Sequence, residues 1–303
     1  MLEFNNLVKH FNSVIALDGM SFAVPPGQVY GFLGPNGAGK TTAMRAVFGL
    51  IELDAGTVEW NSREISLVDK KHFGYMPEER GLYPKMRILD HLVYLARLHG
   101  IDRVQAVKRA HRLIEQLQIQ GGASGKIEAL SLGNRQRCQI AATLIHEPEL
   151  IVLDEPFSGL DPISVEAVRN ILTDQANSGK TVLFSSHQLE VVEDFCESVA
   201  IVDHGRVIVA DRVENLTKSS ASLVVKVKED PNGEYLKSIK GLSVTKGNDG
   251  SLQVEILDGA SPQDILFAAI RAGTLEKYEF ARKPLSSVFK AAISSANSAT
   301  ETV

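Results

Sequence analysis

The chain has 303 residues, a hydrophobic content of 44% and a formal net charge of −5 at pH 7. This length allows one to three domains with a sizeable core, and the charge argues against a general nucleic-acid-binding surface. No apolar run approaches the roughly 18 residues of a membrane-spanning helix, and the first residues lack the pattern of a secretory signal. Cys138 and Cys196 are far apart, so we expect reduced thiols in a cytosolic protein and no cysteine-based metal site.

The first part of the chain is predicted to form strands. Residues 2–8 and 17–24 alternate in the manner of strands, and residues 25–27 predict a turn before a third strand at 29–33. Phe11 lies in the connection between the first two strands, where an aromatic ring could stack on adenine. A role in the core or in a loop is about equally open for this side chain.

The next segment reads Gly34-Pro35-Asn36-Gly37-Ala38-Gly39-Lys40-Thr41-Thr42 and matches the phosphate-binding pattern G-x-x-x-x-G-K-[ST]. It lies between the predicted third strand and a predicted helix over 43–48, which is the context that this motif requires. The glycines let consecutive backbone N–H groups point at phosphate oxygens, and the helix adds its positive end. Lys40 is expected to reach the β- and γ-phosphates, and the Thr41 hydroxyl is expected to bind Mg²⁺.

A set of helices then interrupts the α/β pattern. Residues 57–60 are predicted as a strand, and residues 73–84 as a short strand that runs into a loop. Apolar residues at helical spacing predict helices over 87–99 and 103–119, and a third helix that opens at 130–134 and ends near 146. We therefore expect a helical insertion over about residues 85–147.

Two acids, Asp154 and Glu155, follow the apolar run 150–153, which is typical of a buried parallel strand. A second buried strand is predicted over 181–186 and ends at His187. Ligands of open α/β sheets bind at the carboxyl ends of strands. Two acids in this place can be a helix cap or a solvated turn, but after a phosphate loop the pattern favours a catalytic role.

The pattern changes near residues 216–222, where we expect a second domain. Strands are predicted over 223–228, 242–246, 252–257 and 275–281, and helices over 235–239 and 261–272. The resulting order β-α-β-β-α-β is that of the ferredoxin-like arrangement. A terminal helix over 284–294 and a disordered tail over 295–303 complete the prediction.

Together these motifs resemble the ATP-binding subunit of an ABC transporter over roughly residues 1–215. Five features occur in the order of that family: the phosphate loop, the loop near Glu78, the signature at 130–134, the two acids, and His187. The resemblance implies an ABC cassette over 1–216, with a RecA-like α/β core, an antiparallel β subdomain and the helical insertion. A small α+β, ferredoxin-like domain over 217–294 would follow it.

The resemblance also implies roles for the motif residues. Asp154 would support Mg²⁺, Glu155 would orient or deprotonate the attacking water, and His187 would hydrogen-bond the γ-phosphate, which agrees with what phosphoryl transfer demands. Ser131 and Gly133, at the start of the signature helix, would bind the γ-phosphate of ATP held by a second subunit. The chain is therefore expected to dimerise head to tail with itself or with a related cassette.

Two positions depart from the family pattern. Asn134 ends the signature where the family usually has glutamine, which puts its own contact with the nucleotide in question. Glu78 stands where the family usually has a glutamine that senses Mg²⁺ and the attacking water. A carboxylate can ligate Mg²⁺ but adds negative charge beside phosphate, so hydrolysis could be slower or differently gated. Arg80 would offset part of that charge.

The segment 77–84, Pro-Glu-Glu-Arg-Gly-Leu-Tyr-Pro, is similar to the sodium-extrusion-like exporter ATPases of the family. That branch often has a small C-terminal domain that ends in a Pro-x-x-x-x-Phe helix, like Pro284–Phe289. The resemblance implies an ATPase that uses ATP and Mg²⁺ to drive export through a separate membrane permease, from the cytoplasmic face of the membrane. Leu82, Tyr83 and Met86 would touch the permease, although packing within the insertion is an equal alternative.

Three other functions stay open at this point. A soluble ABC-type ATPase could act on ribosomes or DNA without a permease, although such proteins usually carry two cassettes in one chain. An importer subunit could use the same cassette, with the C-terminal domain as a sensor of a small molecule. A nucleotide-binding regulator could have lost hydrolysis through the changes at Glu78 and Asn134.

Overall fold

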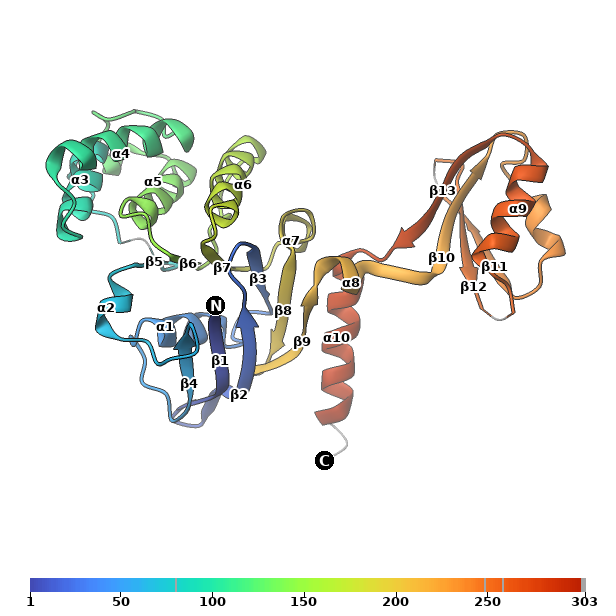
Figure 1. Cartoon of the computed structure of the whole chain (residues 1–303), viewed down its shortest axis with the longest axis horizontal. Helices are drawn as coiled ribbons and strands as arrows, with labels where there is room; N and C mark the ends of the chain where they lie inside the picture. The colour runs from blue at the N-terminus through green and yellow to red at the C-terminus, as the bar shows by residue number, and fades with distance from the viewer. Residues whose placement is uncertain (80, 248, 258, 301–303) are drawn as a thin grey trace. The chain divides into compact units, whose positions relative to one another are not determined.

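The computed structural model describes residues 1–79, 81–247, 249–257 and 259–300, and only the backbone for 219–221, 282 and 295–300. The chain divides into two compact units (Figure 1). The first comprises Met1–Val213 together with the residues from Phe289 onward, and the second comprises Glu214–Val288. Every helix in the described part of the chain is too short or too polar to span a membrane.

The centre of the first unit is a six-stranded sheet in the order β5-β6-β7-β3-β8-β9, parallel except for the pair β8–β9. Its strands are β3 (Val29–Leu33), β5 (Phe73–Met76), β6 (Leu150–Leu153), β7 (Thr181–Ser186), β8 (Ser198–Asp203) and β9 (Arg206–Arg212). All residues of β6, β7 and β8 are buried, as continuous apolar runs predict. Leu153 pairs with Phe184, so the residues that follow β6 lie beside the end of β7.

A smaller antiparallel sheet packs against this centre. Its order is β2-β1-β4, with β1 (Leu2–Phe11), β2 (Val14–Val24) and β4 (Ala55–Trp60). β1 and β2 are longer than the sequence predicts, and Phe11 ends β1 opposite Val14 instead of lying in a loop. Phe22 of this sheet packs on Phe32 of β3, with ring centroids 5.0 Å apart, inside one apolar core that the two sheets share.

The helices of the first unit fall into two groups. They are α1 (Lys40–Val47), α2 (Leu67–Lys70), α3 (Ile88–Leu98), α4 (Arg103–Gln116), α5 (Leu132–Leu144), α6 (Pro162–Asn177) and α7 (Leu189–Phe195), with the 3₁₀ turn η1 (Ile127–Ala129). Figure 1 shows α3, α4 and α5, which form the predicted insertion, on the side of the unit opposite the antiparallel sheet. The short α2 was not predicted; Ser66 and Asp69 form its capping box.

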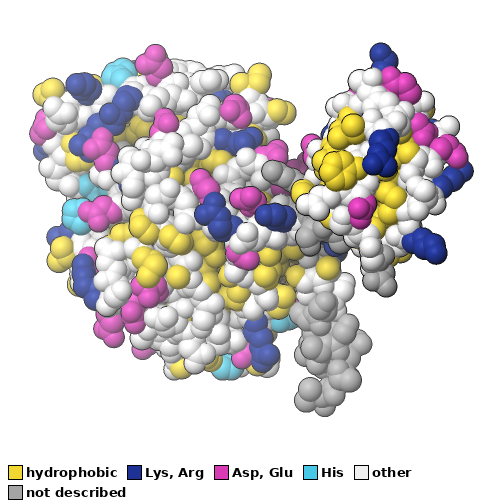
Figure 2. Space-filling view, turned by 45° about the vertical axis from the view of Figure 1, so that its right-hand side comes forward, with side chains coloured by type: hydrophobic (Ala, Val, Ile, Leu, Met, Phe, Trp, Pro, Cys, Tyr) yellow, Lys and Arg dark blue, Asp and Glu magenta, His cyan; other side chains and the backbone are white. Residues whose placement is uncertain are grey.

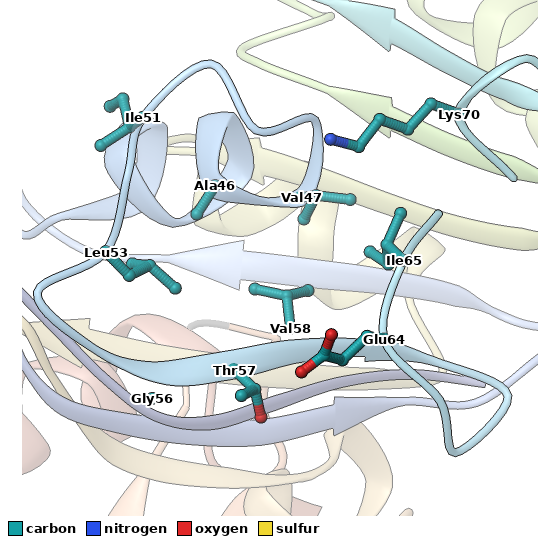
Figure 3. Close-up of a pocket in the computed structure, with 10 residues that line it drawn as sticks. All are labelled: Ala46, Val47, Ile51, Leu53, Gly56, Thr57, Val58, Glu64, Ile65 and Lys70. Atoms are coloured by element: carbon teal, nitrogen blue, oxygen red, sulfur yellow. The ribbon is translucent and has the colours of Figure 1, made fainter. Parts of the chain in front are cut away.

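A pocket lies where α1 faces the antiparallel sheet (Figure 3). Its lining is Ala46, Val47, Ile51, Leu53, Gly56, Thr57, Val58, Glu64, Ile65 and Lys70. Apolar side chains from α1 and β4 form most of the wall, and the charged groups of Glu64 and Lys70 stand at its edge (Figure 3). None of these lining residues belongs to the phosphate loop, so this pocket is separate from the cleft described below.

The second unit contains a four-stranded antiparallel sheet in the order β11-β12-β10-β13. Its elements are β10 (Lys218–Val227), η2 (Glu234–Ser238), β11 (Leu242–Lys246), β12 (Leu252–Ile256), α9 (Pro262–Ala272) and β13 (Leu275–Arg282), preceded by α8 (Val213–Thr217). Leu223 and Val254 of the sheet pack with Leu236 of η2 and Ile265 of α9 in a separate apolar core. The helix predicted over 235–239 is a 3₁₀ turn.

The chain ends in α10 (Leu285–Thr300), which is longer than the helix predicted over 284–294. It continues through 295–300, where the sequence predicts a disordered tail, because neither glycine nor proline interrupts this run of small residues. Residues 301–303 of that predicted tail lie outside the described residues. Hydrophobic side chains gather on the face of the second unit seen in Figure 2, and Leu257, Phe267, Ile270 and Phe280 are exposed on this unit.

Candidate active site

The phosphate loop runs from the end of β3 to the start of α1, as the sequence predicts. Gly37 and Gly39 have φ angles of 83° and 97°, in the left-handed region that glycine adopts without strain. A Cβ on Gly39 would lie 2.4 Å from the backbone oxygen of Ala16, so a larger residue does not fit there. The residue before α1 makes no side-chain cap, which leaves the N–H groups of the first turn available to an anion.

Lys40 is buried at the base of this loop, with 7% of its surface exposed. Its ammonium donates hydrogen bonds to the backbone oxygens of Gly34 (2.7 Å) and Pro35 (3.0 Å). Burial lowers the pKa of Lys40, while nearby carboxylates, Glu155 first among them, act in the opposite direction. The side chain is therefore a buried cation held by carbonyl oxygens, which a phosphate could replace as partners.

Asp154 follows β6 and is 1% exposed. Its Oδ2 accepts a hydrogen bond from the Thr41 hydroxyl (2.7 Å), and its Oδ1 accepts one from the Ser185 hydroxyl (2.6 Å). The carboxylate and the loop threonine are thus in direct contact. Hydroxyl and carboxylate oxygens are the donors that Mg²⁺ prefers, so these residues fit the ion that the sequence predicts.

Glu155 has a φ of 51°, which is unusual for a residue with a side chain. Its backbone N–H donates to Ser185 Oγ (2.9 Å), and its backbone oxygen accepts from Gln136 Nε2 of α5 (2.9 Å). Its carboxylate Oε2 lies 2.9 Å from Nδ1 of His187. Contacts from three segments of the chain therefore hold this residue in an unfavourable backbone conformation.

These groups share one cleft of about 460 Å³, which is within the range of small-molecule sites. Its lining is Val14, Ala16, Asn36, Gly37, Gly39, Lys40, Thr41, Thr42, Glu78, Asp154 and Glu155. Gly34, Pro35 and Ala38 form the part of the loop behind this lining, and His187 joins the cleft through Glu155. An anion-binding loop beside two acids is the arrangement that phosphoryl transfer to water requires.

Comparisons with known proteins agree with this geometry. Residues 17–158 match the family described as ABC transporter. The chain is 37% identical to the uncharacterized ABC transporter ATP-binding protein YhaQ of Bacillus subtilis (strain 168), over 95% of this chain and 97% of that protein.

The chain belongs to the ATP-binding proteins of ABC transporters. This ABC ATPase therefore binds and hydrolyses ATP. It is also 33% identical to the Nod factor export ATP-binding protein I of Ralstonia nicotianae (strain ATCC BAA-1114 / GMI1000), over 71% of this chain and 68% of that protein. A solved structure of the ATP-binding subunit of an ABC transporter is similar, with a TM-score of 0.65 at 28% identity, over 71% of this chain and 91% of that one.

Some predicted nucleotide contacts of this ABC ATPase lie outside the lining of the cleft. Phe11 is 44% exposed, and the Lys9 ammonium lies 5.5 Å from the centre of its ring. The exposed ring is free to stack on a base, so the predicted adenine contact stays a prediction. Arg80, expected to offset the charge of Glu78, lies outside the described residues.

The signature residues also lie outside that lining. Ser131 caps α5, accepting a hydrogen bond from the Asn134 N–H (3.3 Å). The Asn134 amide is 3% exposed, and its Oδ1 accepts from the Gln120 N–H and from Arg137, both at 2.8 Å. The shorter amide is thus used inside the helical insertion, whereas Gly133 packs against the backbone oxygen of Gly159. Nucleotide binding by Ser131, Gly133 and Asn134 stays a prediction.

Sequence reasoning missed two residues that hold the catalytic acids, Ser185 and Gln136. The only signal for Ser185 was a pair of serines at the end of an otherwise apolar strand, and nothing distinguished Gln136 within α5. The predicted helix cap is present: Asp161 accepts from the Ser164 N–H (2.9 Å). That hydrogen bond lowers the pKa of Asp161.

Proposed function

We propose that this chain is the ATPase subunit of an exporter, in which ATP binding closes two cassettes head to tail and hydrolysis reopens them. One observation carries the proposal: the cleft combines the phosphate loop with both acids, but its lining contains no signature residue. A second copy of the chain, facing the first, would bring Ser131 and Gly133 to the open side of the cleft. Each site would then be complete only in the dimer.

Within the site, Lys40 and the loop N–H groups would bind the β- and γ-phosphates. Thr41 and Asp154, already in contact at 2.7 Å, would hold Mg²⁺, with Glu78 as a further carboxylate of the lining. The ion would supply charge compensation for the phosphates.

Glu155 would orient the attacking water and accept its proton, since its carboxylate lines the cleft. The Glu155–His187 contact, 2.9 Å long, holds the imidazole at the mouth of the site, where it would hydrogen-bond the γ-phosphate. Both groups follow neighbouring strands, β6 and β7, which supports a joint role at the reacting phosphate.

A groove on the first unit supports the proposed contact with a permease. This docking groove is lined by Phe73, Tyr75, Pro77, Gly81, Leu82, His91, Leu95, His99, Gln139, Ala142, Thr143 and His146. It contains Leu82 of the segment expected to touch the permease, and the exposed ring of Tyr83 stacks edge-on against His91. The groove thus lies directly after Glu78, which lines the nucleotide cleft.

Buried polar atoms of the docking groove lack hydrogen-bond partners among the described residues. They include both ring nitrogens of His91, Oε1 of Gln139 and Nδ1 of His146. Because Nε2 of His146 faces the backbone oxygen of Phe73 (3.1 Å), it carries the hydrogen and leaves Nδ1 as an acceptor. We propose that a short helix of the permease lies in the groove and brings hydrogen-bond donors to these acceptors.

The export direction is supported by the Nod factor export relative and by the segment 77–84. Pairing with a permease would place the chain at the cytoplasmic face of the membrane. We also propose a cassette over 1–216 and a ferredoxin-like domain over 217–294. The antiparallel strand order β11-β12-β10-β13, with α9 and the turn η2 packed on the sheet, supports the latter.

The variant Glu155→Gln tests the catalytic cycle. We expect it to bind ATP normally, to lose turnover by about 100-fold or more, and to elute as a dimer with ATP and Mg²⁺ in size-exclusion chromatography. Adding Ser131→Ala should shift this species toward the monomer, while each monomer still binds ATP. Normal hydrolysis by Glu155→Gln, or a strictly monomeric ATP-bound form, would contradict the proposal.

A further inference from the structure

We propose that Ser185 is a positioning residue that holds the catalytic acid in place by linking Asp154 to Glu155. This inference rests on the proposed role of Glu155 toward the attacking water. Ser185 is the penultimate residue of β7 and is fully buried, with 0% of its surface exposed. Its hydroxyl lies between the two acids, 2.6 Å from Asp154 Oδ1 and 2.9 Å from the backbone nitrogen of Glu155.

The direction of both hydrogen bonds follows from the groups involved. A carboxylate only accepts, so the single hydrogen of the Ser185 hydroxyl points at Asp154. A lone pair of the same oxygen then accepts the N–H of Glu155. Because Asp154 also accepts from Thr41 (2.7 Å), a continuous chain of hydrogen bonds runs from the phosphate loop to the backbone of Glu155.

The backbone of Glu155 needs this support. Its φ of 51° lies in a region that residues with a Cβ avoid, and such conformations persist only when the surroundings impose them. Ser185 holds its N–H, and Gln136 holds its carbonyl oxygen at 2.9 Å. These two contacts fix the peptide groups on both sides of the Cα, and through them the direction of the carboxylate.

Without the Ser185 hydroxyl, the Glu155 N–H and one oxygen of Asp154 would lose a buried partner. Buried polar groups left in this way seek new partners, so the peptide would move out of its left-handed conformation. A displacement of about 1 Å at a reacting group can cost roughly 100-fold in rate. Binding of ATP, which depends on the loop, would change little.

Other hydroxyls of β7 provide matched controls. Thr181 is fully buried on the same strand, but its Oγ1 has no hydrogen-bond partner among the described residues. Ser186, the next residue, accepts a hydrogen bond from the Gln188 N–H (2.9 Å) and has no such contact with the two acids. The role in linking the acids therefore belongs to Ser185 and not to buried hydroxyls of the strand in general.

The experiment compares steady-state ATP hydrolysis by Ser185→Ala and Thr181→Val. We expect Ser185→Ala to lower kcat by roughly 10- to 100-fold with KM for ATP within about twofold of the parent, and Thr181→Val to change neither. Ser185→Cys keeps the shape but donates weakly, so its kcat should fall between those of Ser and Ala. Thermal unfolding of each variant checks that it is folded, and the Cys variant serves if Ser185→Ala is not.

A second comparison separates this inference from the proposed function. In the Glu155→Gln background, Ser185→Ala should leave the ATP-dependent dimer and the residual turnover unchanged, because the group that Ser185 positions is already absent. Normal turnover by Glu155→Gln alone would overturn the role of Glu155. If Glu155→Gln is inactive but Ser185→Ala loses less than about twofold in kcat, or Thr181→Val loses as much, the positioning role is wrong.

Discussion

In the nucleotide cleft, the buried side chains of Lys40, Asp154 and Ser185 have hydrogen-bond partners within the chain. In the docking groove of the same unit, His91 and His146 leave buried ring nitrogens unpaired. A satisfied polar network keeps its geometry without help, whereas unpaired buried groups cost free energy until a partner arrives. The comparison indicates that the chain prepares its nucleotide site by itself, while the groove is completed by another molecule.

The largest effect is expected where the cleft loses its buried cation. Lys40→Ala should lower kcat/KM for ATP hydrolysis by about 100-fold or more, because the phosphates lose their charged partner and the cleft keeps its three carboxylates. ATP affinity measured by calorimetry should fall with it. Lys70→Ala, in the separate pocket of Figure 3, is the matched control and should leave both quantities unchanged. Equal losses in the two variants would remove the distinction between the sites.

An opposite sign is expected in the groove. His91→Leu removes two unpaired nitrogens from a side chain that is 1% exposed, so it should raise the free energy of unfolding of the isolated chain by about 1 kcal/mol. Asp154→Leu, which strips partners from two hydroxyls, should lower it by about 2 kcal/mol or more. Urea unfolding of both variants tests this contrast, which fails if His91→Leu is the more destabilising.

The smallest effect concerns pH. Burial, with the neighbouring charge of His99 next, lowers the pKa of His146 to about 4, against 6.5 for a free histidine. Between those values the unfolded chain binds more protons than the folded one, so stability should fall as pH drops from 6.5 toward 4.

We expect this histidine to contribute on the order of 1–2 kcal/mol to the slope, and burial lowers the pKa of His91 in the same direction. Thermal unfolding from pH 7 to pH 5 should show a shallower decline for His146→Gln than for the parent. His111→Gln, which changes an exposed histidine of α4, is the control and should keep the parent slope. A parallel decline in all three proteins would exclude His146 as a source.

Much of the cassette was predictable because its signals are local. The phosphate loop, the helical insertion and the buried strands before Asp154 and His187 each depend on residues that are consecutive or at a fixed spacing. Predictions were weaker at element ends: β1 extends to Phe11, η2 is a 3₁₀ turn, and α10 reaches Thr300. Pairing with neighbouring strands and packing against other elements decide such ends, and a single segment does not record them.

By itself, the sequence determined the chemistry of the nucleotide site, because the loop glycines, Lys40 and Thr41 act through backbone geometry that contiguous residues set. Only the tertiary structure decided which groups support the two acids. Ser185 stands beside Asp154 because Leu153 pairs with Phe184 in the parallel register of β6 and β7, strands about 30 residues apart in the chain. Gln136 reaches Glu155 from α5, and His91 is left without a partner, through packing between elements that no local pattern specifies.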